Sequence, residues 1–267
     1  MSEIGFGNIL KMKGSLGDVV TYQLPIGDEL LLMNQFIEKK ITLDFTGEIN
    51  CLDTGKKIKK SYGQGYSYES FMKLACCDVC IVKPELCHFD KGTCREPKWG
   101  EKNCFQPHVI YLSDTSSVKV GITRHSQVPT RWIDQGATKA IPIVQVDNRM
   151  ISGQVEVELK SMFADKTNWR NMLKGLQSDE DLEALKESVF EEFGDLFDDM
   201  GAEEIESGVT EINYPVVEYP QKVTSLGFDK SSKIEGTLLG IKGQYLIFDI
   251  GVINIRKHQG YKVKISV

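Results

Sequence analysis

The chain has 267 residues, of which 41% are hydrophobic and 26% are charged, and its formal net charge is −6. This composition is typical of a globular protein, and the length suits one large domain or two to three small ones. No apolar run approaches the roughly 18 residues that span a bilayer, and the first residues lack a signal-peptide pattern. We therefore expect a cytoplasmic protein without a membrane partner.

The negative charge is concentrated in one segment. Residues 176–210 carry 13 acidic side chains and one lysine, whereas the segments before and after them are each net positive by three. A nucleic-acid-binding surface must therefore be sought in local clusters rather than in the isoelectric point. The acidic segment itself predicts a solvated helix face. The alternative is an acidic surface that binds a basic partner by mimicry.

Residues 1–50 alternate apolar and polar positions around a Pro-Ile-Gly-Asp break. This period of two predicts strands, with room for a short helix at residues 29–37.

All seven cysteines fall in the next segment, residues 51–106, which has no sustained period. In a cytoplasmic chain such crowding favours metal ligation over disulfides, and reduced thiols without a metal are the alternative. A closed site of four thiolates is typical of structural Zn²⁺, which adds on the order of 10 kcal/mol to a segment with little core. The expected ligands are Cys80, Cys87, Cys94 and Cys104, followed as candidates by Cys77 and then His88.

The same segment combines lysines with aromatic residues. This pattern is suited to phosphate contact and base stacking, although a solvated lysine run over a small core explains it equally well. The residues are Lys56, Lys57, Lys59 and Lys60, with Tyr62, Tyr66, Tyr68 and Phe71.

Residues 107–175 mix strand and helix signals. Two β-branched runs, 109–112 and 118–122, flank an Asp-Thr-Ser-Ser turn and predict a hairpin. A helix is expected over residues 129–135, ended by Gly136, and a third strand over 140–146. A second helix is expected from a Ser152 cap through residue 163.

The hairpin places a phenol near an ammonium, which suits phosphodiester chemistry. Tyr111 is the candidate base, and we expect Lys119 across the hairpin to lower its pKa. Arg131 and Arg124 are candidates for binding phosphate oxygens, and Glu156 for holding Mg²⁺ or Mn²⁺. Taken singly, each residue has a structural explanation as core or solvated surface. His125 belongs to the same neighbourhood as a substrate-binding candidate.

The C-terminal third begins with the clearest helix, residues 178–200. Its apolar residues recur at spacings of three and four, and Ser178 with Asp181 resembles a capping box. Strands are expected at residues 237–241, 244–249, 252–256 and 261–267, which predict a small antiparallel barrel or sandwich.

The run HVIYLSDTSSVKVGITR resembles the core of the GIY-YIG nuclease-like superfamily. The longer stretch from Cys80 through LCHFDKGTCREPKWGEKNCFQPHVIYLSDTSSVKVGITRHSQVPTRWIDQGATKAIPI, together with EGTLLGIKGQYLIFDIGVINIRKHQGY, resembles a bacterial family of unknown function numbered 2797. The superfamily implies strand cleavage of nucleic acid, with its tyrosine, glycine, arginine and metal-binding glutamate falling on Tyr111, Gly121, Arg131 and Glu156.

Two kinds of departure accompany the resemblance. Val109 stands in place of a signature glycine, and Lys119 in place of the second tyrosine. Similar proteins also carry a paired-CxxC zinc ribbon, with cysteines where this chain has Thr54, Ser67 and Ser70, so Cys51 is left alone there and no first zinc is expected.

The sequence thus predicts an α+β protein with a GIY-YIG-like three-stranded sheet and flanking helices. The expected order is a β-rich segment (1–50), a zinc module (51–106), the GIY-YIG-like core (107–175), an acidic helix and linker (176–210) and a C-terminal β domain (211–267). The first hypothesis is a divalent-metal-dependent nuclease acting on RNA or DNA, and the second a non-catalytic nucleic-acid-binding protein with a degenerate GIY-YIG fold. An enzyme of nucleotide or RNA modification is a third. The oligomeric state is left open.

Overall fold

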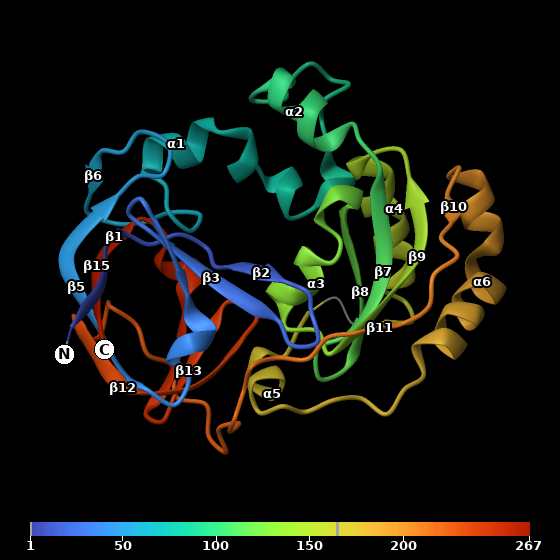
Figure 1. Ribbon diagram of the computed structural model, residues 1–267. Helices are drawn as coiled ribbons and strands as arrows, with labels where there is room; N and C mark the ends of the chain where they lie inside the picture. The colour runs from blue at the N-terminus through green and yellow to red at the C-terminus, as the bar shows by residue number, and fades with distance from the viewer. Residues whose placement is uncertain (1, 164–165) are drawn as a thin grey trace.

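Strands from both ends of the chain form one antiparallel sheet in the computed structural model, which describes residues 2–163 and 166–267 (Figure 1). Strands predicted as separate N-terminal and C-terminal units therefore pair with one another. In spatial order the strands are β1 (Glu3–Asn8), β15 (Tyr261–Ser266), β5 (Lys40–Asn50), β12 (Lys233–Lys242), β13 (Tyr245–Phe248) and β14 (Gly251–Asn254), with β6 (Lys57–Ile58) paired to β5.

A second, three-stranded sheet shares the apolar core of the first, and we call the two sheets together the β-domain. Gly27 has a φ of 53° in a two-residue turn that pairs Ile26 with Glu29. This hairpin holds residues 29–32 in a strand, so the short helix considered at 29–37 is confined to a 3-10 turn at residues 33–36. The elements are β2 (Lys13–Ser15), β3 (Thr21–Ile26), β4 (Glu29–Leu32) and the 3-10 helix η1 (Met33–Phe36).

The predicted hairpin forms one side of a five-stranded antiparallel sheet. Its side chains alternate between two cores: Ile110 and Leu112 face one cluster of apolar residues, whereas Val109 and Tyr111 join the core of the β-domain. The strands are β7 (His108–Asp114), β8 (Val118–Arg124), β9 (Lys139–Val146), β10 (Glu203–Glu204) and β11 (Thr210–Glu211), and β8 lies at an edge.

Helices cover this sheet, and we call the assembly the core domain. Asn148 caps one helix by accepting a hydrogen bond from the Ile151 amide, and Asp181 caps another. The caps expected at Ser152 and Ser178 are displaced, because Ser152 lies inside its helix and the Ser178 amide donates to Asp114 instead. The helices are α3 (Thr130–Gln135), α4 (Arg149–Leu159), α6 (Leu182–Asp199) and the 3-10 helix η5 (His125–Gln127), while α5 (Trp169–Leu173) packs against Ile247 and Val252 of the β-domain.

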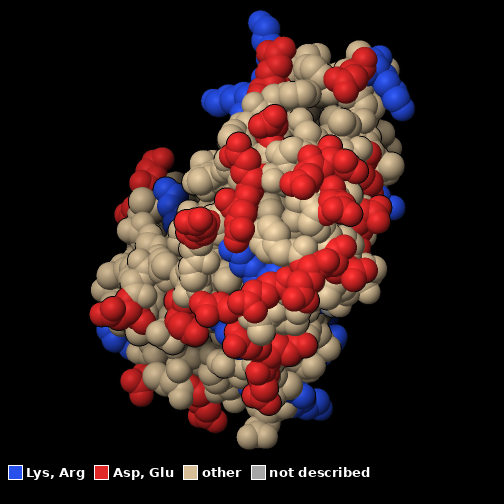
Figure 2. Space-filling model, turned by 90° about the vertical axis from the view of Figure 1, so that its right-hand side faces the viewer, with Lys and Arg blue, Asp and Glu red and all other residues tan. Residues whose placement is uncertain are grey.

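Helix α6 presents its carboxylates to solvent on the outer side of the core domain. Figure 2 shows this face, over which acidic side chains are spread widely. Its apolar residues, including Leu182, Val189 and Phe197, are buried in the core-domain cluster. The acidic face is therefore the solvated side of an amphipathic helix.

The segment from Cys51 to Cys104, here the cysteine module, passes above the space between the two domains (Figure 1). It packs tightly on the core domain, because a Cβ added to Gly153 of α4 would lie 2.6 Å from Pro84. Its helices are α1 (Tyr68–Lys73), η2 (Ala75–Cys77), η3 (Val79–Ile81), η4 (Pro84–Leu86) and α2 (Pro97–Cys104), while η6 (Ile255–His258) belongs to the β-domain.

Buried polar contacts join the two domains. The Gln244 side chain accepts a hydrogen bond from the Met12 amide at 2.9 Å and donates to the Asp134 carboxylate on α3 at 2.9 Å. Asp134 also pairs with Lys11. Within the described part of the chain, no helix is long and apolar enough to cross a membrane.

Candidate functional site

A groove of about 630 Å³ follows the edge strand β8, where both domains and the cysteine module meet. Among the described residues that line it, cations far outnumber carboxylates, although the whole chain is acidic. The carboxylates are Asp134 and Glu156. The cations are Lys11, Lys119, Arg124, Arg131, Arg149, Lys160, Lys166 and Arg256, and we call this site the basic groove.

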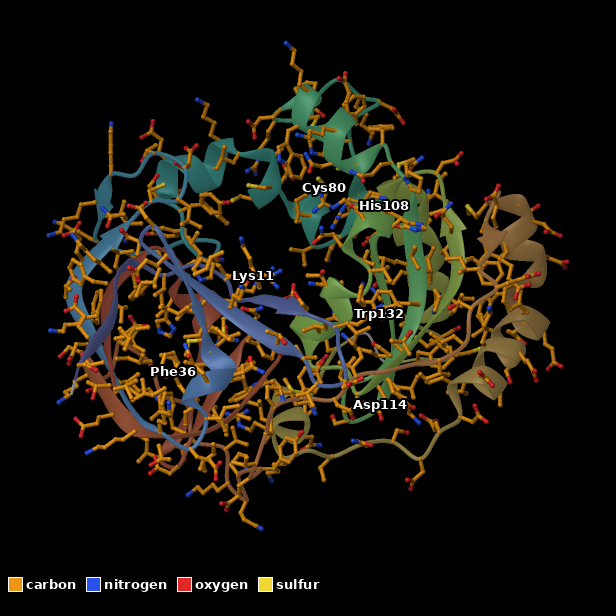
Figure 3. All side chains as sticks on the ribbon, in the orientation of Figure 1. Lys11, Phe36, Cys80, His108, Asp114 and Trp132 are labelled. Atoms are coloured by element: carbon orange, nitrogen blue, oxygen red, sulfur yellow. The ribbon has the colours of Figure 1, made fainter. Side chains whose placement is uncertain are left out.

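The contact between Asp134 and the β-domain positions one wall of the groove. Lys11 projects from the N-terminal segment toward the core domain (Figure 3) and forms an ion pair with Asp134, to which Gln244 also donates. Asp134 lies on α3 less than one turn after Arg131. These contacts therefore fix the helix that presents the Arg131 guanidinium to the groove.

Two guanidinium groups face the groove close to each other. The pKa of Arg256 is lowered, first by burial and then by the charge of Arg131, and Asp134 opposes the shift. The carboxylate of Asp134 is already engaged by Lys11. Like charges held together in a partly desolvated site favour the binding of an anion.

Tyr111 lies beneath the groove rather than in it. Its side chain is fully buried, and its hydroxyl donates to the Gln135 amide oxygen at 3.0 Å. The ring occupies the space above Gly121, where an added Cβ would lie 2.7 Å from the phenol oxygen. Burial raises the pKa of Tyr111, although Arg131 opposes the shift. The expected lowering by Lys119 is therefore corrected: the phenol stays protonated and holds Arg131 and Gln135 in place.

Glu156 projects into the groove from α4. Burial raises the pKa of its carboxyl, and Lys160, 3.5 Å away, and Lys119 oppose that shift. Lys119, Arg131 and Glu156, which come from β8, α3 and α4, thus line one groove. A carboxylate in this position can hold a divalent cation when it is ionised.

The other predicted substrate-binding residues differ in position. Arg124 lines the groove and donates to the Asn103 side chain at 2.9 Å. His125 is exposed, does not line the groove and contacts Gln145 at 2.6 Å. The lysines at 56, 57, 59 and 60 are exposed in the cysteine module, also outside the groove lining.

Several groove residues were not predicted from the sequence. Lys11 and Arg256 are far apart in the sequence, and both line the groove because the segments that carry them belong to the β-domain. Arg149 follows the helix cap at Asn148, and recognition of that cap would have placed it at a helix N-terminus. Lys160 follows Glu156 at the i,i+4 spacing, which is the one local signal among these positions.

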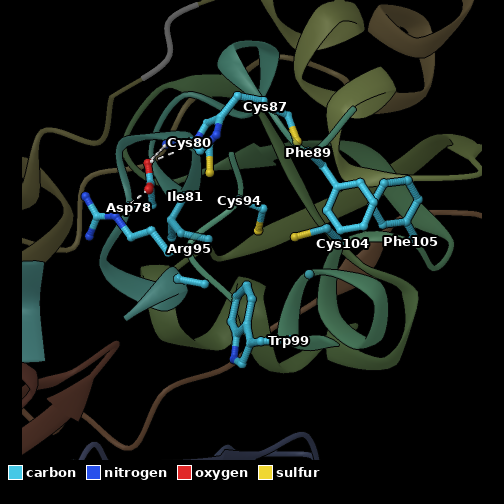
Figure 4. A pocket seen from close by; sticks show the side chains of 13 residues that line it. Asp78, Cys80, Ile81, Cys87, Phe89, Cys94, Arg95, Trp99, Cys104 and Phe105 are labelled. Atoms are coloured by element: carbon cyan, nitrogen blue, oxygen red, sulfur yellow. Dashed lines mark hydrogen bonds and ion pairs between the residues drawn. The ribbon is translucent and has the colours of Figure 1, made fainter. Parts of the chain in front are cut away.

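The four predicted zinc ligands line one cavity of about 20 Å³, a volume sufficient for a single small ion (Figure 4). This set is the thiol cluster, Cys80, Cys87, Cys94 and Cys104. Burial, Asp78 and the neighbouring thiols raise the pKa of Cys80 to about 11. Burial raises the pKa of Cys104 as well, and cysteine sulfurs are donors that suit a soft divalent ion.

Of the two reserve ligands, His88 lines this cavity and Cys77 does not. His88 lines it and lies with Asp78 and Cys80 in a group whose ligand atoms are within 4.8 Å of one another. Cys77 does not line it, and its sulfur lies 3.9 Å from that of Cys76. Asp78 itself is paired with Arg95 at 2.6 Å.

A second cluster surrounds Cys51, the cysteine for which no zinc is expected. The sulfur of Cys51 lies 3.2 Å from the Ser67 amide and 3.5 Å from the Ser70 hydroxyl, which donates to Asp53 at 2.7 Å. Thr54 also forms hydrogen bonds to the Cys51 thiol. Cys51, Thr54, Ser67 and Ser70 are named the hydroxyl cluster here.

Comparison with known proteins identifies the family. The model of a family described as "Protein of unknown function (DUF2797)" matches residues 38–263, which include the cysteine module, the core domain and most strands of the large sheet. No curated protein and no solved structure matches the chain.

Proposed function

Because this chain belongs to the DUF2797 family of unknown function, its activity must be inferred from the site itself, and we propose that it binds RNA or DNA in the basic groove and cleaves phosphodiester bonds with a divalent metal. The observation that carries the proposal is the lining of the groove by eight cations and two carboxylates in a chain of net charge −6. Nucleic acid is a polyanion whose binding depends on such clustered positive charge.

The arginines supply the geometry for phosphate. A guanidinium binds two phosphate oxygens through parallel hydrogen bonds, which an ammonium cannot do. Arg124, Arg131 and Arg256 all line the groove, and the charge of Lys119 acts on Glu156. A phosphodiester held there would have its charge neutralised from several sides.

Glu156 is the proposed metal ligand for cleavage. A Mg²⁺ or Mn²⁺ ion at this carboxylate would supply a nucleophilic hydroxide and neutralise the transition state. Tyr111 acts here as a positioning residue, since its hydrogen bond to Gln135 and its contact with Arg131 order two groups of the groove wall. These residues coincide with those of the GIY-YIG-like pattern, to which we assign the core domain by this proposal.

One observation favours the second candidate, a nucleic-acid-binding protein that does not cleave. Tyr111 has no exposed surface and a raised pKa, so the residue that the superfamily pattern would use is not available as a base. Cleavage then depends on the metal-bound water alone.

Binding and cleavage are tested separately. We expect a labelled RNA or DNA duplex to bind with an affinity that falls steeply with salt. Arg131→Ala should weaken binding about tenfold or more, because it removes a charge-assisted hydrogen bond. Arg170→Ala, a matched arginine stacked on Trp169 outside the groove lining, should leave binding unchanged. Binding that is insensitive to salt and to Arg131→Ala would refute the groove as the site.

For cleavage, the same substrates are incubated with Mg²⁺ or Mn²⁺. Glu156→Gln, which keeps the shape and removes the charge, should abolish cleavage and preserve binding. Because the pKa of Glu156 is raised, protons compete with the metal at a higher pH than for an ordinary glutamate, so metal-dependent activity should fall as the medium becomes acidic. Binding without cleavage under every metal would select the second candidate.

We also propose that the thiol cluster holds one structural Zn²⁺. The support is that all four cysteines line one small cavity, beside the group of possible ligands formed by Asp78, Cys80 and His88. The Arg149 guanidinium interacts with Cys80 and Cys104, so a positive charge accompanies the thiolates. Metal analysis should find one zinc per chain, and much less than one would remove the assignment.

A further inference from the structure

Besides the basic groove, the described residues form an exposed aromatic surface beside it. The chain reverses between Tyr62 and Tyr66, whose backbones exchange two hydrogen bonds of 2.9 Å, and Gln64 at the tip of this hairpin lines the groove. The tip is anchored, because its carbonyl accepts a hydrogen bond from the Gln259 side chain at 3.1 Å. The surface behind the tip is therefore fixed relative to the groove.

The rings behind the tip form a platform with cations around it. Tyr62 packs edge-on against Tyr68 with ring centroids 5.3 Å apart, and 59% of Tyr68 is exposed. Met72 on the same helix α1 is 51% exposed. The Lys60 ammonium lies 5.2 Å from the centre of the Tyr62 ring, and further exposed lysines precede it at 56, 57 and 59. We call Tyr62, Tyr68, Met72 and Lys60 the aromatic platform.

The residues of the aromatic platform indicate which kind of ligand they would bind. An exposed aromatic face favours a planar partner, and the surrounding ammonium groups favour an anionic one. Unpaired nucleotides present both a planar base and a phosphate, whereas the bases of a duplex are stacked on each other and hidden. The platform therefore distinguishes a single strand from a duplex, which the groove cations do not.

We infer that the aromatic platform binds an unpaired strand that continues out of the basic groove, so that the substrate is a nucleic acid with a single-stranded segment next to the bound phosphodiester. The inference rests on the proposed function and names its substrate class. Bases stack on Tyr68 and Tyr62, and Lys60 neutralises the adjoining phosphate. The hairpin tip at Gln64 is the point where the strand passes from one site to the other.

The test compares two kinds of labelled probe by fluorescence anisotropy. One is a blunt duplex, and the other is the same duplex with an unpaired extension of about six nucleotides at one end or at the other. Each kind is made as RNA and as DNA. One such extension should tighten binding about tenfold, since stacking contributes about 1–3 kcal/mol per base. Tyr68→Ala together with Tyr62→Ala should abolish this advantage and leave the affinity for the blunt duplex unchanged.

A matched control is available in the β-domain. Phe6 is 50% exposed and has the Lys262 ammonium 5.5 Å from its ring centre, as Tyr62 has Lys60, but it does not line the groove. Phe6→Ala should preserve the advantage of the extension. Tyr68→Phe should preserve it too, which separates stacking from a role of the hydroxyl, and thermal unfolding of each variant confirms the fold.

The outcomes separate the two proposals. Equal affinity for blunt and extended probes would overturn the inference and leave the groove proposal standing. Equal weakening of both probes by the tyrosine substitutions would also overturn it, because the platform would then have no preference for unpaired nucleotides. If neither probe binds to the unmodified protein, the proposed function fails and the inference falls with it.

Discussion

The cysteine module contains two clusters of small polar side chains, the thiol cluster and the hydroxyl cluster, whose chemistry differs. In the thiol cluster, four cysteines line a cavity of about 20 Å³. In the hydroxyl cluster, three of the four corresponding groups are hydroxyls, and they are joined by hydrogen bonds around Cys51, with Ser67 and Ser70 3.0 Å apart. In the proposal above a metal would neutralise the first set, whereas the groups of the second set form hydrogen bonds with one another.

Hydrogen bonds hold the loop-rich segment around the hydroxyl cluster. Ser67 caps α1 by accepting a hydrogen bond from the Ser70 amide, and Ser70 in turn donates to Asp53. Each neutral hydrogen bond contributes about 1 kcal/mol, compared with on the order of 10 kcal/mol for structural zinc. The hydroxyl cluster thus stabilises its segment less than a bound zinc would, but it needs no metal.

The largest effect is expected at the thiol cluster. Cys104→Ser should eliminate the bound zinc and unfold much of the cysteine module, with a loss on the order of 10 kcal/mol of binding free energy. Metal analysis and limited proteolysis measure the two consequences. Cys76→Ser, a half-buried thiol outside the cavity lining, should retain both metal and protease resistance. Equal behaviour of the two variants would contradict the assignment.

The second-largest effect is expected when the hydroxyl cluster is converted into a set of four thiols. Thr54→Cys, Ser67→Cys and Ser70→Cys together restore four thiols in the hydroxyl cluster. We expect the zinc content to rise from one to two per chain, with a gain of several kcal/mol in stability at saturating metal. Ser61→Cys with two of these substitutions supplies as many thiols without completing the cluster, and it should bind only one zinc. A triple variant that binds one zinc would show that the scaffold has lost the geometry.

A pH effect distinguishes the thiol of the hydroxyl cluster. Burial raises the pKa of Cys51, but hydrogen bonds from Ser70, Ser67 and Thr54 outweigh it and lower the pKa to about 6. A lowered folded-state pKa contributes stability that is present above the unfolded value, roughly 8.5, and is lost as the pH falls through about 6. Denaturant unfolding near pH 8.5 and near pH 5.5 should therefore show a drop on the order of 2 kcal/mol that Cys51→Ala lacks. The same drop in both proteins would assign it to other groups.

The smallest effect is expected for a single hydroxyl. Ser70→Ala removes the donor to Asp53 and one contact of Cys51, so the free energy of unfolding should decrease by about 1 kcal/mol at neutral pH. Chemical denaturation measures it, and Ser2→Ala, whose hydroxyl is exposed with one long contact of 3.4 Å, serves as the control. A loss as large as that of Cys104→Ser would mean that the two clusters do not differ in kind.

The sequence predicts features that depend on neighbouring residues. The β7–β8 hairpin follows from two β-branched runs around a turn, and the α+β class with the DUF2797 family is confirmed. The four cysteines of the thiol cluster, which are crowded along the chain, line one cavity. The GIY-YIG assignment, the metal and the nucleic-acid partner stay predictions.

Long-range contacts account for what the sequence does not reveal. Lys11 and Arg256 reach the groove only because β1 and β15 are neighbours, and no local pattern encodes that pairing. The buried state of Tyr111 depends on Trp132 and on the β-domain core, so its pKa could not be read from Lys119 nearby in the hairpin.

The pairing of β5 with both β12 and β15 has a consequence for biosynthesis. On the ribosome, β5 emerges long before either partner, so both of its edges stay open while the core domain is being made. Such an edge can pair with another nascent chain, and the long loops that must close slow the folding of the sheet. The basic groove, which needs Arg256, is completed only after all of its other lining residues have been synthesised.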